Sequence, residues 1–259
     1  MIEAQNVSKW FDGQQVLFDL STRFETGKTN LIIGQSGSGK TVFMKCLIGL
    51  LTPEKGEIFY DGRSFREMDA RQRRQLRTEI GMLFQGSALF DNETVLGNVM
   101  FPLKMFSALT RKEQLERARF CISRVGLEKA DDKYPSEISG GMQKRVAIAR
   151  AIALNPRYLF CDEPNSGLDP KTSILIDNLL SDITHEYGIT TVINTHDMNS
   201  VLGIGENIVF INKGHCDWTG DDRTIFRSTS RSLNDFVFAS KLFQEVKKFL
   251  EREYDVNNP

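Results

Sequence analysis

The stretch Gly34-Gln35-Ser36-Gly37-Ser38-Gly39-Lys40-Thr41 decides how the rest of the chain is understood. It follows an apolar run at 29–33 and precedes a segment at 42–50 whose composition predicts a helix. A strand, a glycine-rich turn and a helix in this order form a phosphate-binding loop, because glycines let backbone N–H groups point inward and a helix N-terminus favours an anion. We therefore expect Lys40 to reach β- and γ-phosphates and the Thr41 hydroxyl to bind Mg²⁺.

Length and charge narrow the class of protein. The 259 residues can form one large domain, or one domain with a subdomain. The 33 Lys and Arg nearly cancel the 34 Asp and Glu, which argues against a nucleic-acid partner. No apolar run approaches the ~18 residues that a membrane span needs, and Met1–Ala4 lacks the features of a signal peptide. Four scattered cysteines suit reduced thiols in a core. We expect a soluble, cytoplasmic protein.

Alternating strands and helices predict a mainly parallel sheet whose functional residues lie at the strand ends. Short β-like runs at 16–17 and 21–24 precede the glycine-rich loop, and residues from about 87 to 155 are mostly helical in pattern. Further strands are expected at 56–62, 80–84, 157–163, 189–194 and 207–212, the last opening a terminal hairpin.

Three other segments allow two interpretations each. The basic segment 65–77 is a solvated helix face or a nucleic-acid patch, and the neutral chain favours the first. The apolar segment 88–106 is local core or an exposed groove for a partner helix. The amphipathic stretch 235–254 packs on its own domain or on a neighbouring protomer. We divide the chain into a main domain at 1–234, with its helical subdomain at about 87–155, and a C-terminal amphipathic extension at 235–259.

Two acids end the apolar run 158–161. Buried charges at such a point usually meet a cation or take part in proton chemistry. Asp162 is placed to hold Mg²⁺, directly or through water, and Glu163 to polarise an attacking water. His196 follows a second apolar strand, which makes it a candidate for the γ-phosphate; an exposed strand end and a structural histidine are the alternatives.

A second glycine-rich turn, Ser139-Gly140-Gly141, directly precedes a predicted helix and so forms another anion-binding N-terminus. One nucleotide does not need two such sites from one subunit. Two subunits that face each other would use both, each completing its partner's site. The alternative is an ordinary turn.

Taken together, these motifs resemble those of ABC-transporter ATPase subunits over nearly the whole chain. Gly34–Thr41 resembles the Walker A motif, Gln85 the Q-loop glutamine and Ile138–Met142 the family signature. Asp162 and Glu163 resemble Walker B with its catalytic glutamate, Ser166–Asp169 the D-loop, and His196 the switch histidine. Phe11 falls where members place an aromatic ring against adenine, and Trp10 is the competing candidate.

The resemblance implies a P-loop NTPase fold: a RecA-like parallel sheet, an N-terminal antiparallel β-subdomain and an α-helical subdomain with the signature. It also implies a homodimer that closes on two ATP with Mg²⁺. In it Glu163 would activate water and His196 steady the phosphoryl group. Thr41, Asp162 and Gln85 would lie around the Mg²⁺ ion as its protein contacts. Ser139, Gly140, Gly141 and Asp169 would contact nucleotide as well.

The last position of the signature narrows the resemblance to one subfamily. Met142 stands where members carry Gln, and Gln143 follows. Together with Phe84–Asp91 and Thr195–Ser200, this is similar to the ATPases of bacterial Mla-type phospholipid transport systems. That likeness implies an inner-membrane permease, contacted through the apolar segment near Gln85–Phe106, an MCE-domain lipid-binding partner and a place on the cytoplasmic face of the membrane. The alternatives are the ATPase of another importer or exporter, and a soluble ABC protein acting on ribosomes or DNA.

Overall fold

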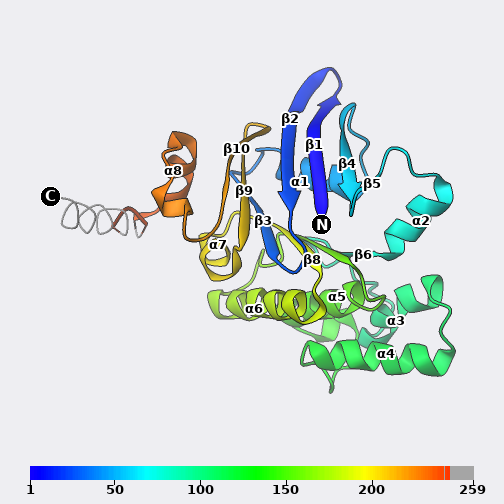
Figure 1. Ribbon diagram of the computed structural model, residues 1–259. Coiled ribbons are helices and arrows are strands. Elements are labelled where there is room, and N and C mark those ends of the chain that lie inside the picture. The colour runs from blue at the N-terminus through cyan, green and yellow to red at the C-terminus, as the bar shows by residue number, and fades with distance from the viewer. Residues whose placement is uncertain (242, 246–259) are drawn as a thin grey trace.

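The computed structural model describes residues 1–241 and 243–245, and two β-sheets form its framework (Figure 1). The larger sheet has six strands in the order β10-β9-β3-β8-β7-β6, and all its neighbours are parallel except the hairpin of β9 and β10. Its strands are β3 (Thr29–Ile33), β6 (Ile80–Leu83), β7 (Tyr158–Asp162), β8 (Thr190–Thr195), β9 (Asn207–Asn212) and β10 (His215–Gly220). The predicted parallel α/β core and the terminal hairpin are confirmed.

The smaller sheet is antiparallel, in the order β2-β1-β4-β5. It contains β1 (Ile2–Phe11), β2 (Gln14–Phe24), β4 (Lys55–Tyr60) and β5 (Arg63–Ser64). The two short runs expected at 16–17 and 21–24 are parts of one strand, β2. Asp19 has a φ of 45° between them, and Ser8 of β1 bridges the irregularity: its hydroxyl donates to the Asp19 carboxylate (2.8 Å) and accepts from the Asp19 N–H (2.9 Å).

Helix α1 (Lys40–Leu47) packs between the two sheets, where Phe43 and Leu47 meet core side chains of both. The opposite face of the large sheet is covered by α5 (Gly140–Ala151) and α6 (Pro170–Tyr187), with α7 (Met198–Ile204) beside them (Figure 1). Because helices cover both of its faces, the central strand β3 is buried at each of its five residues.

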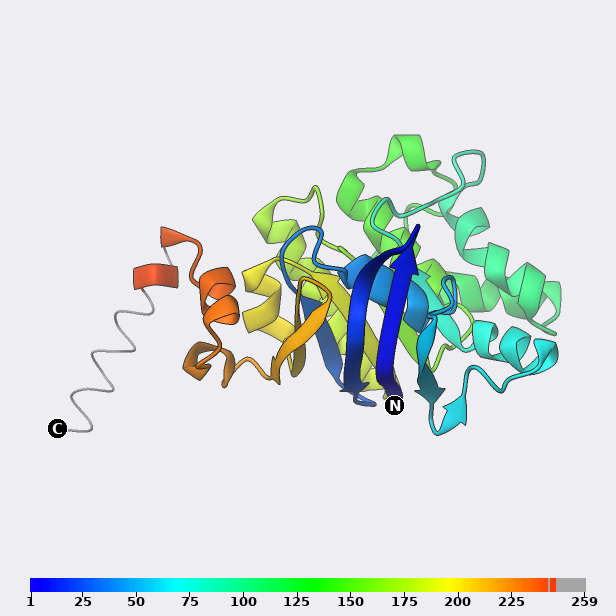
Figure 2. The same cartoon turned by 90° about the horizontal axis from the view of Figure 1, so that it is seen from above.

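The remaining helices lie toward the two ends of the molecule (Figures 1 and 2). Helices α3 (Val95–Phe106) and α4 (Arg111–Arg124) pack on α5, whereas α2 (Ala70–Thr78) projects with an exposed basic face, as expected of a solvated helix. Two short 3₁₀ helices are Pro135–Glu137 and Ile225–Arg227. Among residues 1–241 and 243–245, no helix has both the length and the apolar character that crossing a bilayer requires.

The chain after β10 forms α8 (Arg231–Val237). Leu233 and Val237 are buried, and the Phe236 ring lies 5.4 Å from that of Phe210, so α8 packs on its own domain. The amphipathic stretch expected at 235–254 starts inside this helix and is interrupted after Val237; residues 241 and 243–245 are helical again. Its remainder lies outside the described residues, and the domain division at 234 stays a prediction.

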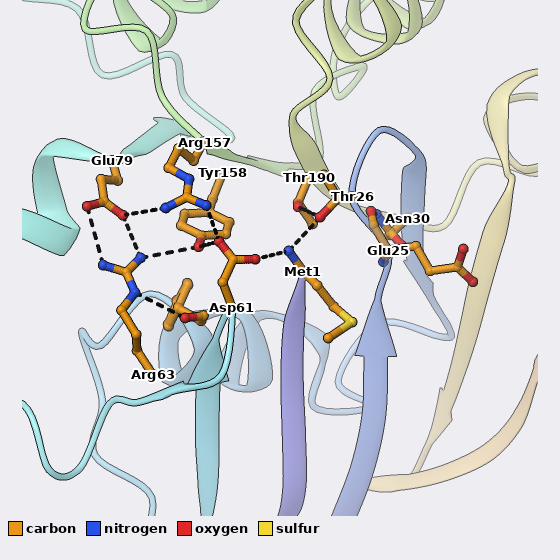
Figure 3. A network of polar contacts seen from close by, with 11 residues as sticks. Met1, Glu25, Thr26, Asn30, Asp61, Arg63, Glu79, Arg157, Tyr158 and Thr190 are labelled. Carbon is orange, nitrogen blue, oxygen red and sulfur yellow. Dashed lines mark hydrogen bonds and ion pairs between the residues drawn. The ribbon is translucent and has the colours of Figure 1, made fainter.

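A polar network ties the amino ends of the parallel strands to the small sheet (Figure 3). Asp61, in the β4–β5 turn, pairs with Arg157 (2.5 Å) and accepts from the Tyr158 hydroxyl (2.6 Å). Arg63 pairs with Glu79 (2.6 Å) and donates to the same hydroxyl (3.3 Å). Burial raises the pKa of Asp61, but hydrogen bonds, from the Met1 amine first and then from Tyr158, outweigh it and the net pKa is lowered. The two sheets are therefore joined by charges that are already paired.

All four cysteines are free thiols, as the sequence predicts: Cys46, Cys121 and Cys161 are buried and Cys216 is half-buried.

Candidate functional site

The glycine-rich loop Gly34–Thr41 connects β3 to α1, as predicted, and its backbone geometry demands glycine. Gly34, Gly37 and Gly39 have φ angles of 149°, 78° and 105°. A Cβ atom on Gly34 would lie 2.2 Å from the Ile211 carbonyl oxygen. Because β9 passes this close, the loop can turn only with glycine at its first position.

Lys40 occupies the centre of this loop. Its ammonium group donates to the carbonyl oxygens of Gly34 (2.9 Å) and Gln35 (3.0 Å), and the residue is 6% exposed. Burial lowers the pKa of Lys40, while the negative charges of Glu163 and Asp162 oppose that effect. A buried cation whose acceptors are carbonyls of its own loop is a suitable partner for a phosphate anion.

Asn194, at the end of β8, brings together two candidate metal ligands. Its amide nitrogen donates to the Asp162 carboxylate (2.5 Å) and to the Thr41 hydroxyl (3.2 Å). The amide oxygen of Asn194 and the hydroxyl of Ser38 are buried without hydrogen-bond partners. The sequence reasoning missed Asn194; its signal is a polar residue at the end of an otherwise apolar strand.

This donor set fits Mg²⁺ bound with a nucleotide. No cluster of three or more His, Cys, Asp or Glu side chains suited to a metal occurs in the described part of the chain. Mg²⁺ commonly takes only one or two protein oxygens and completes its shell with phosphates and water. One carboxylate and one hydroxyl, from Asp162 and Thr41, match that habit.

Glu163 and His196 follow β7 and β8 and meet each other. The Nδ1 atom of His196 lies 2.8 Å from a carboxylate oxygen of Glu163. Glu163 has a φ of 49°, which is uncommon for a residue with a side chain, and its N–H is held by the Asn194 carbonyl (2.9 Å). Backbone strain of this kind concentrates at functional sites. The expected convergence of these strand ends is therefore present.

These groups surround one cavity of about 980 Å³. The glycine-rich loop forms one wall, Glu163 and His196 another, and Phe236 and Phe243 contribute from the C-terminal side. Gln85 also lines it, with its side-chain amide donating to the Ser166 hydroxyl (3.4 Å), so its contact with a metal stays a prediction.

Phe11 and Trp10 are both outside the residues that line this cavity, whereas Val16 belongs to them. Phe11 is 40% exposed with the Lys9 ammonium 5.2 Å from its ring centre, and Trp10 lies under Lys55. The adenine contact of Phe11 or Trp10 stays a prediction.

The second glycine-rich turn lines a separate hollow of about 540 Å³. Ser139 caps α5 by accepting the Met142 N–H (3.3 Å), and Asp169 caps α6 in the same way with Thr172 (3.0 Å). Ser139, Gly140, Gly141 and Asp169 all face this hollow, and Gly167 touches both cavities. The second turn thus lies at the N-terminus of α5, as predicted, and phosphate binding there stays a prediction.

The apolar segment 88–106 is local core in part, as predicted, while a partner helix for its exposed side chains stays a prediction. Val99 and Leu103 of α3 are buried in the core. Exposed apolar side chains gather on the same part of the molecule: Phe90, Phe101, Met105, Phe106 and Leu109 are each between 38% and 59% exposed. We call this set the α3 apolar surface.

A glycine-rich loop between a strand and a helix, with acids at the end of the neighbouring strand, defines the class of P-loop NTPases. The family model for ABC transporters matches residues 17–166. The methionine import ATP-binding protein MetN of Clostridium acetobutylicum is 38% identical over 237 residues, covering 92% of this chain and 74% of that protein. This chain therefore belongs to the ABC transporter family and is an ATP-binding ATPase.

Other relatives agree. A probable ribonucleotide transport ATP-binding protein, mkl, of Mycobacterium tuberculosis is 34% identical, covering 91% of this chain and 66% of that protein. The dimeric post-hydrolysis structure of the cassette MJ0796 with ADP and Pi has a TM-score of 0.77 and 33% identity, covering 86% and 99% of the two chains. For cbiO1 from Clostridium perfringens, part of a transporter complex, the TM-score is 0.82 and the identity 27%, covering 96% and 98%. The predicted family and fold are confirmed, whereas the methionine and ribonucleotide relatives do not support the narrower Mla assignment.

Proposed function

We propose that this chain works as a homodimer that hydrolyses ATP and drives a separate membrane permease for the import of a small solute. The observation that carries the proposal is the convergence of Lys40, Thr41, Glu163 and His196 on one cavity, with Asp162 joined to Thr41 through the Asn194 amide. The import direction draws on the methionine import relative, which supports it better than a lipid substrate.

Within one chain, the loop amides and Lys40 hold the phosphates, and Thr41 and Asp162 hold Mg²⁺, which supplies charge neutralisation when bound. Gln85 lines the same cavity and would link the Mg²⁺ ion to the permease. Glu163 accepts a proton from water as it attacks, and His196 steadies both Glu163 and the transferred group. Phe11 remains the proposed adenine contact, and Trp10 is the alternative candidate.

The second hollow supports the dimer. Ser139, Gly140, Gly141 and Asp169 line a different hollow from the one at the chain's own glycine-rich loop and would complete the site of a second copy. The MJ0796 cassette of similar fold was solved as a dimer. The α3 apolar surface is the proposed permease contact, which would place the ATPase on the cytoplasmic face of the membrane.

A phospholipid transporter of Mla type, with an MCE-domain partner, is the second candidate. The observation that favours it is Met142 in place of the signature Gln, together with the segments around Gln85 and His196. Neither relative named above concerns lipid, so this candidate rests on the motif residues alone.

Mass spectrometry of the complex from gently solubilised membranes separates the candidates. Import of a small solute predicts a permease with a solute-binding protein. An MCE-domain protein and bound phospholipid would replace that proposal with the lipid transporter. Ribosomal or DNA-repair proteins instead would contradict both.

A further inference from the structure

Lys144 is a buried lysine that the proposed mechanism does not use. It lies in the second turn of α5, five residues after Ser139, and is only 5% exposed. Burial lowers its pKa. A cation near a helix N-terminus opposes the helix dipole, so this position does not stabilise α5. The ammonium group must therefore be held there by other contacts.

Those contacts join two segments of the ATPase cavity. The Lys144 ammonium donates to the carbonyl oxygen of Gln85 and lies 3.5 Å from that of Glu163. Gln85 follows β6 and Glu163 follows β7, so one side chain of α5 spans the ends of two neighbouring strands. The Glu163 carbonyl also accepts the Ser166 backbone N–H at 3.1 Å, so Lys144 adds a side-chain contact to a carbonyl that its own turn already holds.

The same helix holds the rest of the Gln85 segment. The Arg150 guanidinium donates to the carbonyl oxygens of Ser87 and Ala88, both at 2.7 Å. Ser87 and Ala88 have φ angles of 62° and 49°, which are unfavourable for residues with a side chain. The segment is therefore kept in a strained conformation by two cations of α5, and of these two Lys144 also reaches the Glu163 carbonyl.

Glu163 needs such support because its own backbone is strained, with a φ of 49°. Its N–H donates to the Asn194 carbonyl, and its own carbonyl accepts from the Ser166 N–H (3.1 Å) and from the Lys144 ammonium (3.5 Å). Loss of one anchor would let the peptide relax and shift the carboxylate. Displacement of a catalytic group by about 1 Å can cost on the order of 100-fold in rate.

We propose that Lys144 is a positioning residue: by fixing the peptide carbonyls of Gln85 and Glu163, it holds the Glu163 carboxylate where it acts on water. Because Ser139, the N-cap of α5, is proposed to face the second copy, a movement of α5 on dimer closure also reaches Glu163. The inference rests on the proposed catalytic role of Glu163.

Three variants of the full chain test the proposal. Lys144→Met keeps the unbranched stem and removes the donors, whereas Lys144→Arg keeps a cation with donors. Arg117→Met is the matched control, because Arg117 also donates to carbonyls of the α5 end, those of Ile152 (2.8 Å) and Ala153 (3.0 Å), away from the cavity. The measurements are kcat and KM for ATP, ATP affinity by fluorescent-analogue binding, and the unfolding midpoint.

We expect Lys144→Met to lower kcat about tenfold or more, with ATP affinity changed less than about threefold. Lys144→Arg should recover kcat to within about threefold, and Arg117→Met should stay within about twofold of the wild type. If Lys144→Met does not fold, Lys144→Gln replaces it under the same expectations. A kcat within twofold of the wild type in the folded variant, or an equal loss in Arg117→Met, overturns the proposal.

Glu163→Gln, measured in parallel, separates the proposed role of Glu163 from that of Lys144. Turnover by Glu163→Gln would remove the proposed role of Glu163. Loss of turnover in Glu163→Gln with normal turnover in Lys144→Met would overturn only the role of Lys144.

Discussion

The two ends of the parallel sheet differ in the groups that hold their cations. At the amino ends, Asp61, Arg63, Glu79 and Arg157 pair with one another and with Tyr158 (Figure 3). At the carboxyl ends, Lys40 is held by carbonyls of its own loop, and a cavity separates the surrounding walls. Charges that are mutually satisfied join layers, whereas a cation held only by neutral groups can accept an anionic ligand.

The strained residues divide in the same way. Of the non-glycine residues with positive φ, Glu163, Ser87 and Ala88 are on or beside the cavity, where other groups hold them in place. Asp61 also has a positive φ, but it lies in a tight turn, where aspartate tolerates this conformation. Positive φ thus accompanies the ATPase cavity at Glu163, Ser87 and Ala88, whereas at Asp61 and at Lys213 in the β9–β10 turn it accompanies chain reversal.

The largest effect is expected for Glu163→Gln. The amide cannot accept a proton from water, so kcat for ATP should fall by about 100-fold or more while ATP binding remains. Phosphate release and nucleotide binding, measured on the same preparation, check this. Rapid hydrolysis by Glu163→Gln would show that the carboxyl ends of the strands do not owe their catalytic role to Glu163.

Lys40→Ala should weaken ATP binding by about 10- to 100-fold, because charge-assisted hydrogen bonds contribute about 1.5–3 kcal/mol. Titration with a fluorescent ATP analogue measures the loss. Lys45→Ala, an exposed lysine of the same helix, is the control and should bind normally. Equal affinities in the two variants would contradict the phosphate role of the loop.

Ser139→Asp separates capping from nucleotide contact at the second hollow. Aspartate caps a helix as well as serine does, so the unfolding midpoint should hardly change. Its negative charge would face the γ-phosphate bound by a second copy, and ATP turnover should fall about tenfold. Normal turnover together with normal stability would contradict a role of this hollow in ATP hydrolysis.

Asp61→Asn should lower the free energy of unfolding by about 1–2 kcal/mol at neutral pH and leave turnover unchanged. The pKa of Asp61 is lowered from 3.8 in the folded chain, so its stabilisation is present above that value and is lost as pH falls below it. Urea unfolding at pH 7 and pH 3.5 should show the difference shrinking. The control is Asp182→Asn, which changes an exposed acid of α6. An equal loss of unfolding free energy in Asp182→Asn would contradict the stabilising role of Asp61.

The sequence predicts the parallel core and the candidate site well, because both depend on local patterns. The loop Gly34–Thr41 carries its own turn chemistry, and Asp162, Glu163 and His196 each follow an apolar strand whose end must reach the same edge. By contrast, the roles of Asn194 and Lys144 depend on contacts between distant segments, which no local pattern shows. The continuity of β2 was missed for the same reason, since Ser8 of another strand supports Asp19.

Sedimentation velocity of Glu163→Gln tests the central claim most directly, namely that two copies complete each ATP site at the carboxyl ends of the sheet. With ATP and Mg²⁺ the variant should sediment as a dimer, and it should return to a monomer when Lys40→Ala or Ser139→Asp is added. A Glu163→Gln chain that binds ATP yet stays monomeric at every concentration would contradict the account.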